Sequence, residues 1–111
     1  MHPDLKHIYN ELKEYTSQEQ LMGHDVDLRV EDNIVIKVYI RDENGINGQM
    51  KKPLMIVYFS RPGILTVKFL MLDPSKSGYL FENFRLLQLE SNSFKVDFEK
   101  LEDFEHFVGA L

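Results

Sequence analysis

The sequence of 111 residues contains no cysteine. This absence excludes a thiol nucleophile, a zinc site built from thiolates and a disulfide framework. It favours a reducing compartment, so we expect a cytoplasmic protein. Residues 1–20 lack the apolar core of a signal peptide. Because Arg61 and Lys68 interrupt the longest apolar stretch, the chain has no run of the ~20 apolar residues that cross a membrane. We therefore predict a soluble protein with no membrane partner.

Signatures of nucleotide binding and of common catalytic sites are also missing from the sequence. Gly45 and Gly48 lack the third glycine of a dinucleotide fingerprint, and no Gly-Lys-Ser or Gly-Lys-Thr of a P-loop is present. No serine lies in a G-x-S-x-G elbow. His2 and His7 are five residues apart, a spacing that does not align two metal ligands on one helix face. We predict no catalytic residue, no cofactor and no metal, and hence a protein that is not an enzyme.

Net charge and composition further limit the classes of protein to which the chain can belong. The formal net charge is −5, which argues against a nucleic-acid partner because a phosphate backbone requires a basic surface. Apolar residues make up 43% of the chain, and eight phenylalanines and five tyrosines are available to fill a core. A chain of this length is near the usual size of one domain. Residues 1–111 are therefore predicted to form a single packed domain.

The chain begins with a helical pattern and continues with an alternating one. Leu5, Ile8 and Leu12 recur at helical spacing, and Gly23 would end that helix. Apolar and polar residues then alternate over 26–40, which predicts a β-hairpin. Pairing Val30 with Ile34, and Leu28 with Ile36, leaves the three-residue loop 31–33, in which Asn33 would take the left-handed conformation.

A second hairpin is predicted over 53–72, PLMIVYFSRPGILTVKFLML, with Pro62-Gly63 in a type II turn. Pairing Arg61 with Ile64 assigns alternate residues to two faces. The face assigned to the core contains Leu54, Ile56, Tyr58, Leu65, Val67, Phe69 and Met71. The opposite face is still mostly apolar, which indicates an interface, and contains Met55, Val57, Phe59, Ile64, Thr66, Lys68 and Leu70.

The last third of the sequence is less regular. Residues 73–78 predict a turn, and 79–90 fit either a helix or a strand, of which we favour a strand over 84–90. Alternation over 94–98 predicts a further strand, and 101–111 an amphipathic helix. The predicted fold is α+β: an N-terminal helix, an antiparallel sheet of four to five strands and a C-terminal helix.

These features favour a small acidic protein-interaction module without enzymatic activity, such as an adaptor, regulator, chaperone or inhibitor. It would act through the apolar face of the 53–72 hairpin, and its partner would be another protein or a second copy, giving a homodimer.

Two alternatives remain open. The first is an acidic inhibitor or immunity protein that blocks a basic enzyme surface through carboxylates at the ends of the first hairpin: Asp25, Asp27, Glu31, Asp32, Asp42 and Glu43. The second is a small-molecule-binding domain or enzyme, with a pocket between sheet and helices lined by Tyr39, Tyr58, Phe69 and Phe84.

Overall fold

A computed structural model describes residues 3–21, 26–32, 35–41, 50–71 and 74–111. These ranges confirm the predicted α+β class, although the antiparallel sheet has six strands rather than four or five. None of the described helices is long and apolar enough to span a membrane. The elements are α1 (Pro3–Leu21), β1 (Val26–Glu31), β2 (Val35–Arg41), β3 (Met50–Arg61), β4 (Ile64–Leu70), the 3₁₀ helix η2 (Pro74–Lys76), α2 (Ser77–Asn83), β5 (Leu87–Glu90), β6 (Ser93–Phe98) and α3 (Leu101–Ala110).

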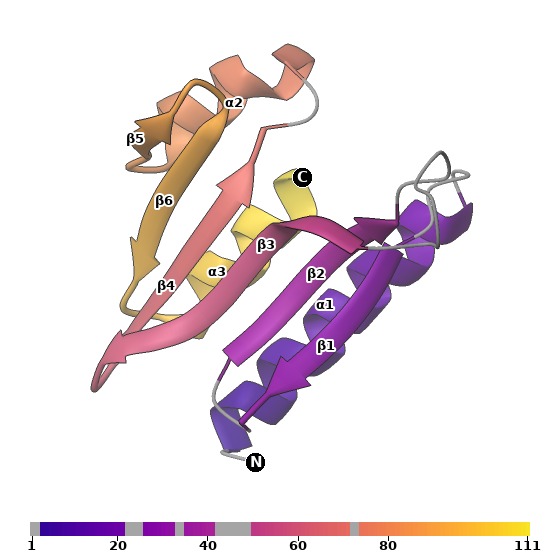
Figure 1. Cartoon of the computed structure of the whole chain (residues 1–111). Helices are drawn as coiled ribbons and strands as arrows, with labels where there is room; N and C mark the ends of the chain where they lie inside the picture. Colours follow the sequence, from indigo (N-terminus) through magenta and orange to yellow (C-terminus); the bar gives the residue numbers. More distant parts are fainter. Residues whose placement is uncertain (1–2, 22–25, 33–34, 42–49, 72–73) are drawn as a thin grey trace.

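The sheet has the strand order β1-β2-β3-β4-β6-β5. The first four strands follow one another as neighbours, whereas β6 pairs directly with β4 and leaves β5 at the edge. All three α-helices lie on one side of the sheet, behind the strands in Figure 1. The opposite side, which we call the front face, is covered by no described helix or strand (Figure 1).

The core lies between the sheet and the helices. The predicted stripe of α1 is confirmed, because Leu5, Ile8 and Leu12 are all buried. The same spacing in α3 buries Phe104 and Phe107. Each fully buried side chain of this size contributes roughly 1.5–3 kcal/mol through the hydrophobic effect. Burial of these apolar side chains therefore stabilises the packing of α1 and α3 on this side of the sheet.

Phe107 holds the helical layer to the sheet and to α2. Its ring centroid lies 5.0 Å from that of Phe69 on β4, 5.3 Å from that of Phe84 and 5.5 Å from that of Phe98 on β6. The Phe69 and Phe84 rings meet it edge to face, an arrangement that aromatic quadrupoles favour. Residues far apart in the sequence thus form one aromatic cluster.

The predicted faces of the 53–72 hairpin are wrong for residues 55–59 of β3, although Leu54 is buried as predicted. Arg61 pairs with Ile64 as predicted, but the next pair is Phe59 with Leu65. Ser60 is therefore an extra residue, a β-bulge that shifts β3 by one position relative to β4. A shift of one residue exchanges the two faces of a strand. Ile56 and Tyr58, predicted for the core, consequently lie on the front face instead.

The first hairpin keeps its predicted faces, but its predicted register is wrong by two residues. Val30 pairs with Ile36, and Leu28 with Val38. Because the shift is even, the same side chains still face the core. Among the described residues of this hairpin, Asp32 has a positive φ of 53°, whereas Asn33, and Gly23 before the hairpin, lie outside the described residues.

Residues 74–90 contain both a helix and a strand. The predicted turn over 73–78 is wrong at its end, where Ser77 and Gly78 already belong to α2. The predicted strand over 84–90 is present only from Leu87 to Glu90. Leu80 and Phe84 lie four residues apart and both pack on the core cluster, which explains the helix that precedes β5.

Candidate functional site: the front face of the sheet

The front face is made of the strand residues that alternate with core residues. Lys37 lies between Ile36 and Val38, both of which are fully buried on the helix side. Lys95 lies in the same way between Phe94 and Val96. Since successive side chains of a strand point to opposite sides, both lysines extend from the front face.

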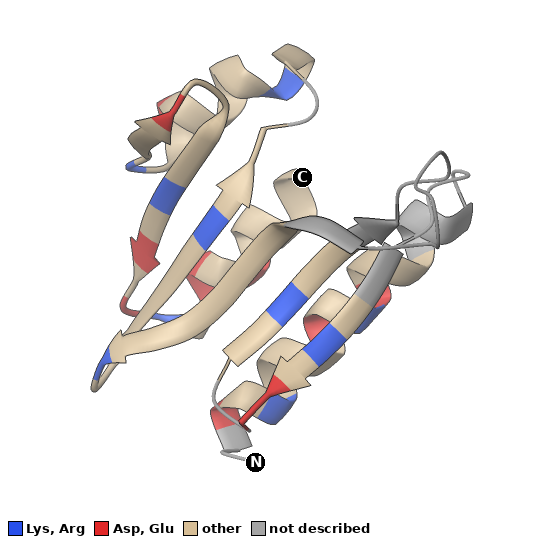
Figure 2. Cartoon of the chain, in the orientation of Figure 1, with Lys and Arg blue, Asp and Glu red and all other residues tan. Residues whose placement is uncertain are grey.

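Strand pairing brings four cations into one line across this face. Arg29 pairs with Lys37, Lys37 with Ile56, Ile56 with Lys68, and Lys68 with Lys95, which in turn pairs with Leu87. Figure 2 shows the basic residues of β1, β2, β4 and β6 as a line that crosses the sheet. We call this line the basic row: Arg29, Lys37, Ile56, Lys68, Lys95 and Leu87.

Each lysine or arginine of the basic row has a neighbour that positions it. Lys37 Nζ lies 2.8 Å from Glu31 Oε2, and the hydrogen bond that Lys37 donates to Glu31 is the main cause of the raised pKa of Lys37. Lys68 Nζ lies 5.7 Å from the centroid of the Tyr58 ring. The guanidinium carbon of Arg29 lies 5.8 Å from the Tyr39 ring. Cation–π contacts of this length hold a cation over the face of an aromatic ring.

A hydrogen-bonded trio lies beside the basic row. Thr66 is fully buried, and its Oγ1 donates to Asp97 Oδ1 at 2.7 Å. A second hydrogen bond of 2.8 Å joins Thr66 Oγ1 to Ser60 Oγ, at the bulge. Asp97 Oδ2 lies 4.0 Å from Lys95 Nζ, so this carboxylate weakens the positive potential at one end of the basic row.

The structure divides the predicted interface between the two faces. Met55 and Val57 are buried, and Phe59 is half-buried on the same core side. Thr66, Lys68 and Leu70 lie on the front face, where alternation also places Ile64. The hairpin therefore does not present the continuous apolar face predicted from its sequence. Its front face carries both polar and apolar side chains.

Sequence reasoning did not identify Arg29, Lys37 and Lys95 as site residues. A local signal was available, because each cation of the basic row lies between two apolar residues: LRV, IKV, VKF and FKV. Single charges at such positions extend from one face of a strand whose other face is buried. Only the strand order shows that the four charges lie in one line.

The predicted acidic surface is described only in part. Glu31 is paired with Lys37, and Asp32 is exposed in the turn that follows β1. Asp27 belongs to β1, where it pairs with Tyr39. Asp25, Asp42 and Glu43 lie outside the described residues.

A groove of about 910 Å³ lies between α2, β6 and α3. Of the residues predicted to line a pocket, Phe84 does so, together with Arg85, Asp103 and His106. Phe69 is instead buried in the core. Tyr39 and Tyr58 are on the front face. The groove is open to solvent, so it would bury less of a ligand than an enclosed cavity does.

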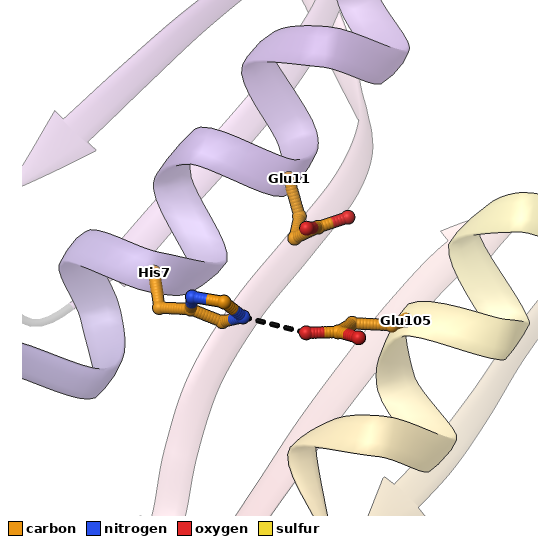
Figure 3. Close-up of side chains that lie close together, drawn as sticks. All are labelled: His7, Glu11 and Glu105. Carbon is orange, nitrogen blue, oxygen red and sulfur yellow. Dashed lines mark hydrogen bonds and ion pairs between the residues drawn. The ribbon is translucent and has the colours of Figure 1, made fainter.

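A second cluster of polar side chains joins the two long helices (Figure 3). His7 Nε2 of α1 donates to Glu105 Oε1 of α3 at 2.5 Å, and this hydrogen bond is the main reason that the pKa of His7 is raised above 6.5. Burial opposes the shift, while the charges of Glu105, Glu11 and Asp4 add to it. One ligand atom from each of His7, Glu11 and Glu105 lies within 4.8 Å of the others, which is close enough to hold a cation. The ion pair already explains this arrangement, and we assign no metal to it.

Charge is distributed unevenly between the two sides of the molecule (Figure 2). The described side chains of α1 and α3 include six acids and two lysines: Asp4, Glu11, Glu14, Glu102, Asp103, Glu105, Lys6 and Lys13. The basic row lies on the opposite side of the sheet. Among the described side chains, the front face is thus the less acidic side.

Comparison of the chain with protein-family models, with curated proteins and with solved structures finds no match. The front face must therefore be interpreted from its own geometry.

Proposed function

We propose that this protein is a protein-binding module without enzymatic activity, and that the front face is its binding surface. The observation that supports the proposal is the basic row, in which two pairs of cations are separated by Ile56 and followed by Leu87, across strands that no described element covers. Four cations aligned by the fold can orient a partner of opposite charge. Ile56 and Leu87, in the same row, offer apolar area to the same partner.

The partner we favour is a different protein rather than a second copy. A face-to-face dimer would place two basic rows in one interface, and desolvating like charges together is costly. Nucleic acid is also disfavoured, because a phosphate backbone carries a charge at every nucleotide and would meet Glu31 and Asp97 beside the cations, whereas a protein segment can place its acids over the cations alone. The net charge of −5 also disfavours the binding of nucleic acid.

The two alternatives stay as weaker proposals. The groove between α2 and α3 favours a small-molecule-binding domain or enzyme, and a thermal-shift screen with metabolites would test it by a rise in melting temperature. An acidic inhibitor would bind a basic protein in a salt-dependent manner through carboxylates such as Glu31 and Asp32. Since Glu31 is already paired with Lys37, we rank the acidic surface below the front face.

Site-specific photocrosslinking in cells that naturally express the chain tests the proposed function. A photoreactive phenylalanine replaces Tyr58 on the front face and, as a control, Tyr79, which is 58% exposed on α2. We expect a protein adduct from position 58 that is absent from position 79 and is lost in the Lys68→Glu variant. No adduct at position 58, or equal adducts at both positions, would overturn the proposal. An adduct of twice the mass of the chain would instead identify a second copy as the partner.

A further inference from the structure

We infer that the front face binds an extended acidic segment that crosses the strands and carries the pattern acid-x-apolar-x-acid-x-apolar. This inference rests on the proposed function and specifies the chemistry of the partner. It follows from the spacing of the basic row, from the charge distribution within it and from the two apolar residues in it.

The cations of the basic row form two pairs rather than an even series. Arg29 and Lys37 are on neighbouring strands, as are Lys68 and Lys95, while Ile56 of β3 separates the pairs. Neighbouring strands are roughly 4.8 Å apart, so the midpoints of the two pairs, three strands apart, are separated by about 14 Å. An extended chain advances about 3.4 Å per residue, so residues i and i+4 span the same ~14 Å.

The apolar positions of the row agree with the same spacing. Residue i+2 of the segment would lie midway between the two acids, over Ile56 of β3. Residue i+6 would lie about one strand beyond Lys95, roughly 7 Å past the second acid, at the level of Leu87. Leu87 is 59% exposed, which leaves apolar area for a ligand to bury. Alternate residues of an extended segment point the same way, so all four side chains can face the sheet together.

Each pair of cations is also suited to a single carboxylate. Lys68 and Lys95 oppose each other directly, so their charges repel unless an anion is shared between them. A carboxylate accepts two hydrogen bonds or more and can contact both ammonium groups. At the other end, the Arg29 guanidinium can bind a carboxylate through two parallel N–H groups. The acid bound between Lys68 and Lys95 would therefore reduce the repulsion between these two lysines.

A peptide titration followed by ¹⁵N NMR of the full chain tests the inference. The test peptide is Ser-Glu-Ser-Leu-Ser-Glu-Ser-Leu-Ser. One control replaces both glutamates by glutamine, and a second has the same composition with the two glutamates adjacent and the two leucines adjacent. We expect amide shifts in β1, β2, β4 and β6, with an affinity about five- to tenfold higher than for the glutamine control. The adjacent-glutamate control should also bind more weakly, and all binding should weaken as salt is raised.

Charge-reversed and neutral variants complete the test. Lys68→Glu/Lys95→Glu should weaken binding of the test peptide by about tenfold or more, and Lys68→Gln/Lys95→Gln should do so less strongly. Dispersed NMR spectra of both variants would show that they remain folded. Equal binding of all three peptides, or shifts confined to α2 and α3, would overturn the inference. Tighter binding of a short oligothymidylate than of the test peptide would also overturn it and would indicate a phosphate ligand.

The peptide test and the crosslinking test can fail separately. A protein adduct at position 58 without selective peptide binding would leave the proposed function standing and reject the acidic pattern. Absence of both would reject the front face as a binding surface.

Discussion

Lys68 and Lys95 are directly opposed across β4 and β6, so two like charges face each other in the middle of the front face. Opposed like charges in a sheet are destabilising, whereas opposite charges at such positions contribute roughly 0.2–1 kcal/mol. We expect Lys68→Glu and Lys95→Glu each to relieve this repulsion, and the double variant to restore it. The free energy of unfolding in urea, measured for all four members of this double-mutant cycle, should show a coupling of about 0.5 kcal/mol or more. Additive effects would contradict this prediction.

The bulge at Ser60 leads to a sharp contrast between neighbouring residues of β3. Val57 is fully buried on the core side, so Val57→Asp should cost more than about 4 kcal/mol and unfold most of the protein. Ile56 lies on the front face, so Ile56→Asp should cost only about 1 kcal/mol. Circular dichroism melts of the two variants measure the difference. A folded Val57→Asp protein would mean that the register of β3 is wrong.

Stability should depend on pH through His7. Its pKa in the folded state is raised, mainly by the hydrogen bond to Glu105, from the 6.5 of an unperturbed histidine. The stabilisation from this ion pair is therefore fully present below about pH 6.5, the unfolded-state pKa, and is lost as the pH rises through the folded-state pKa. Glu11 and Asp4 also favour the protonated form, so they act in the same direction.

The measurement for His7 is the melting temperature between pH 5.5 and 8.5. The difference between the wild-type protein and Glu105→Gln should be largest at the acidic end and should vanish at the alkaline end. Glu102→Gln, which removes the same charge from the same helix, serves as the control and should give a nearly constant difference. A wild-type advantage that grew with pH would have the wrong sign for this mechanism.

Asp97 should weaken the binding of acidic ligands. Asp97→Asn removes the carboxylate that lies 4.0 Å from Lys95, while the amide oxygen of asparagine can still accept the hydrogen bond from Thr66. We expect the acidic test peptide to bind about two- to fivefold more tightly, with little change in stability. The NMR titration described above measures the affinity. Unchanged or weaker binding would indicate that the ligand does not lie near this end of the basic row.

The elements that pack through one regular stripe could be predicted from the sequence. Leu5, Ile8 and Leu12 identify α1, and the spacing of Phe104 and Phe107 identifies α3, because helical periodicity reflects burial on a single face. The faces of β1 and β2 were predicted for the same reason, although their register was not. An even shift of register leaves the alternation unchanged, so the sequence pattern cannot detect it.

The bulge and the short helix were harder to predict, because both depend on tertiary contacts. Residues 54–59 are all apolar or aromatic, so either face of this strand could have been assigned to the core. The register that collects Ser60, Thr66 and Lys68 on one face was the better choice, since it keeps polar side chains out of the core. Helix α2 is seven residues long and packs through Leu80. A helix this short has little periodic signal, and its stability comes from packing.

The candidate site was largely invisible to local reasoning. Lys68 was included among the predicted interface residues. Arg29 and Lys37 are aligned with it by the pairing of β1, β2, β3 and β4, and Lys95 joins it only because β6, and not β5, is the neighbour of β4. Strand order depends on contacts between distant parts of the chain, and alternation within single strands does not specify it. A binding site formed by residues of several neighbouring strands is therefore harder to predict from the sequence than a site formed by a contiguous motif.

The uneven placement of charge among the described residues corresponds to an electric dipole across the sheet. Its negative end is the layer of α1 and α3, and its positive end is the basic row on the other side of the sheet. An acidic partner would be repelled by the net charge of −5 at long range, yet the field gradient near the protein would turn the front face toward it. The same asymmetry would turn the helices away from the partner. Approach from the wrong side is thereby discouraged before any side chain makes contact.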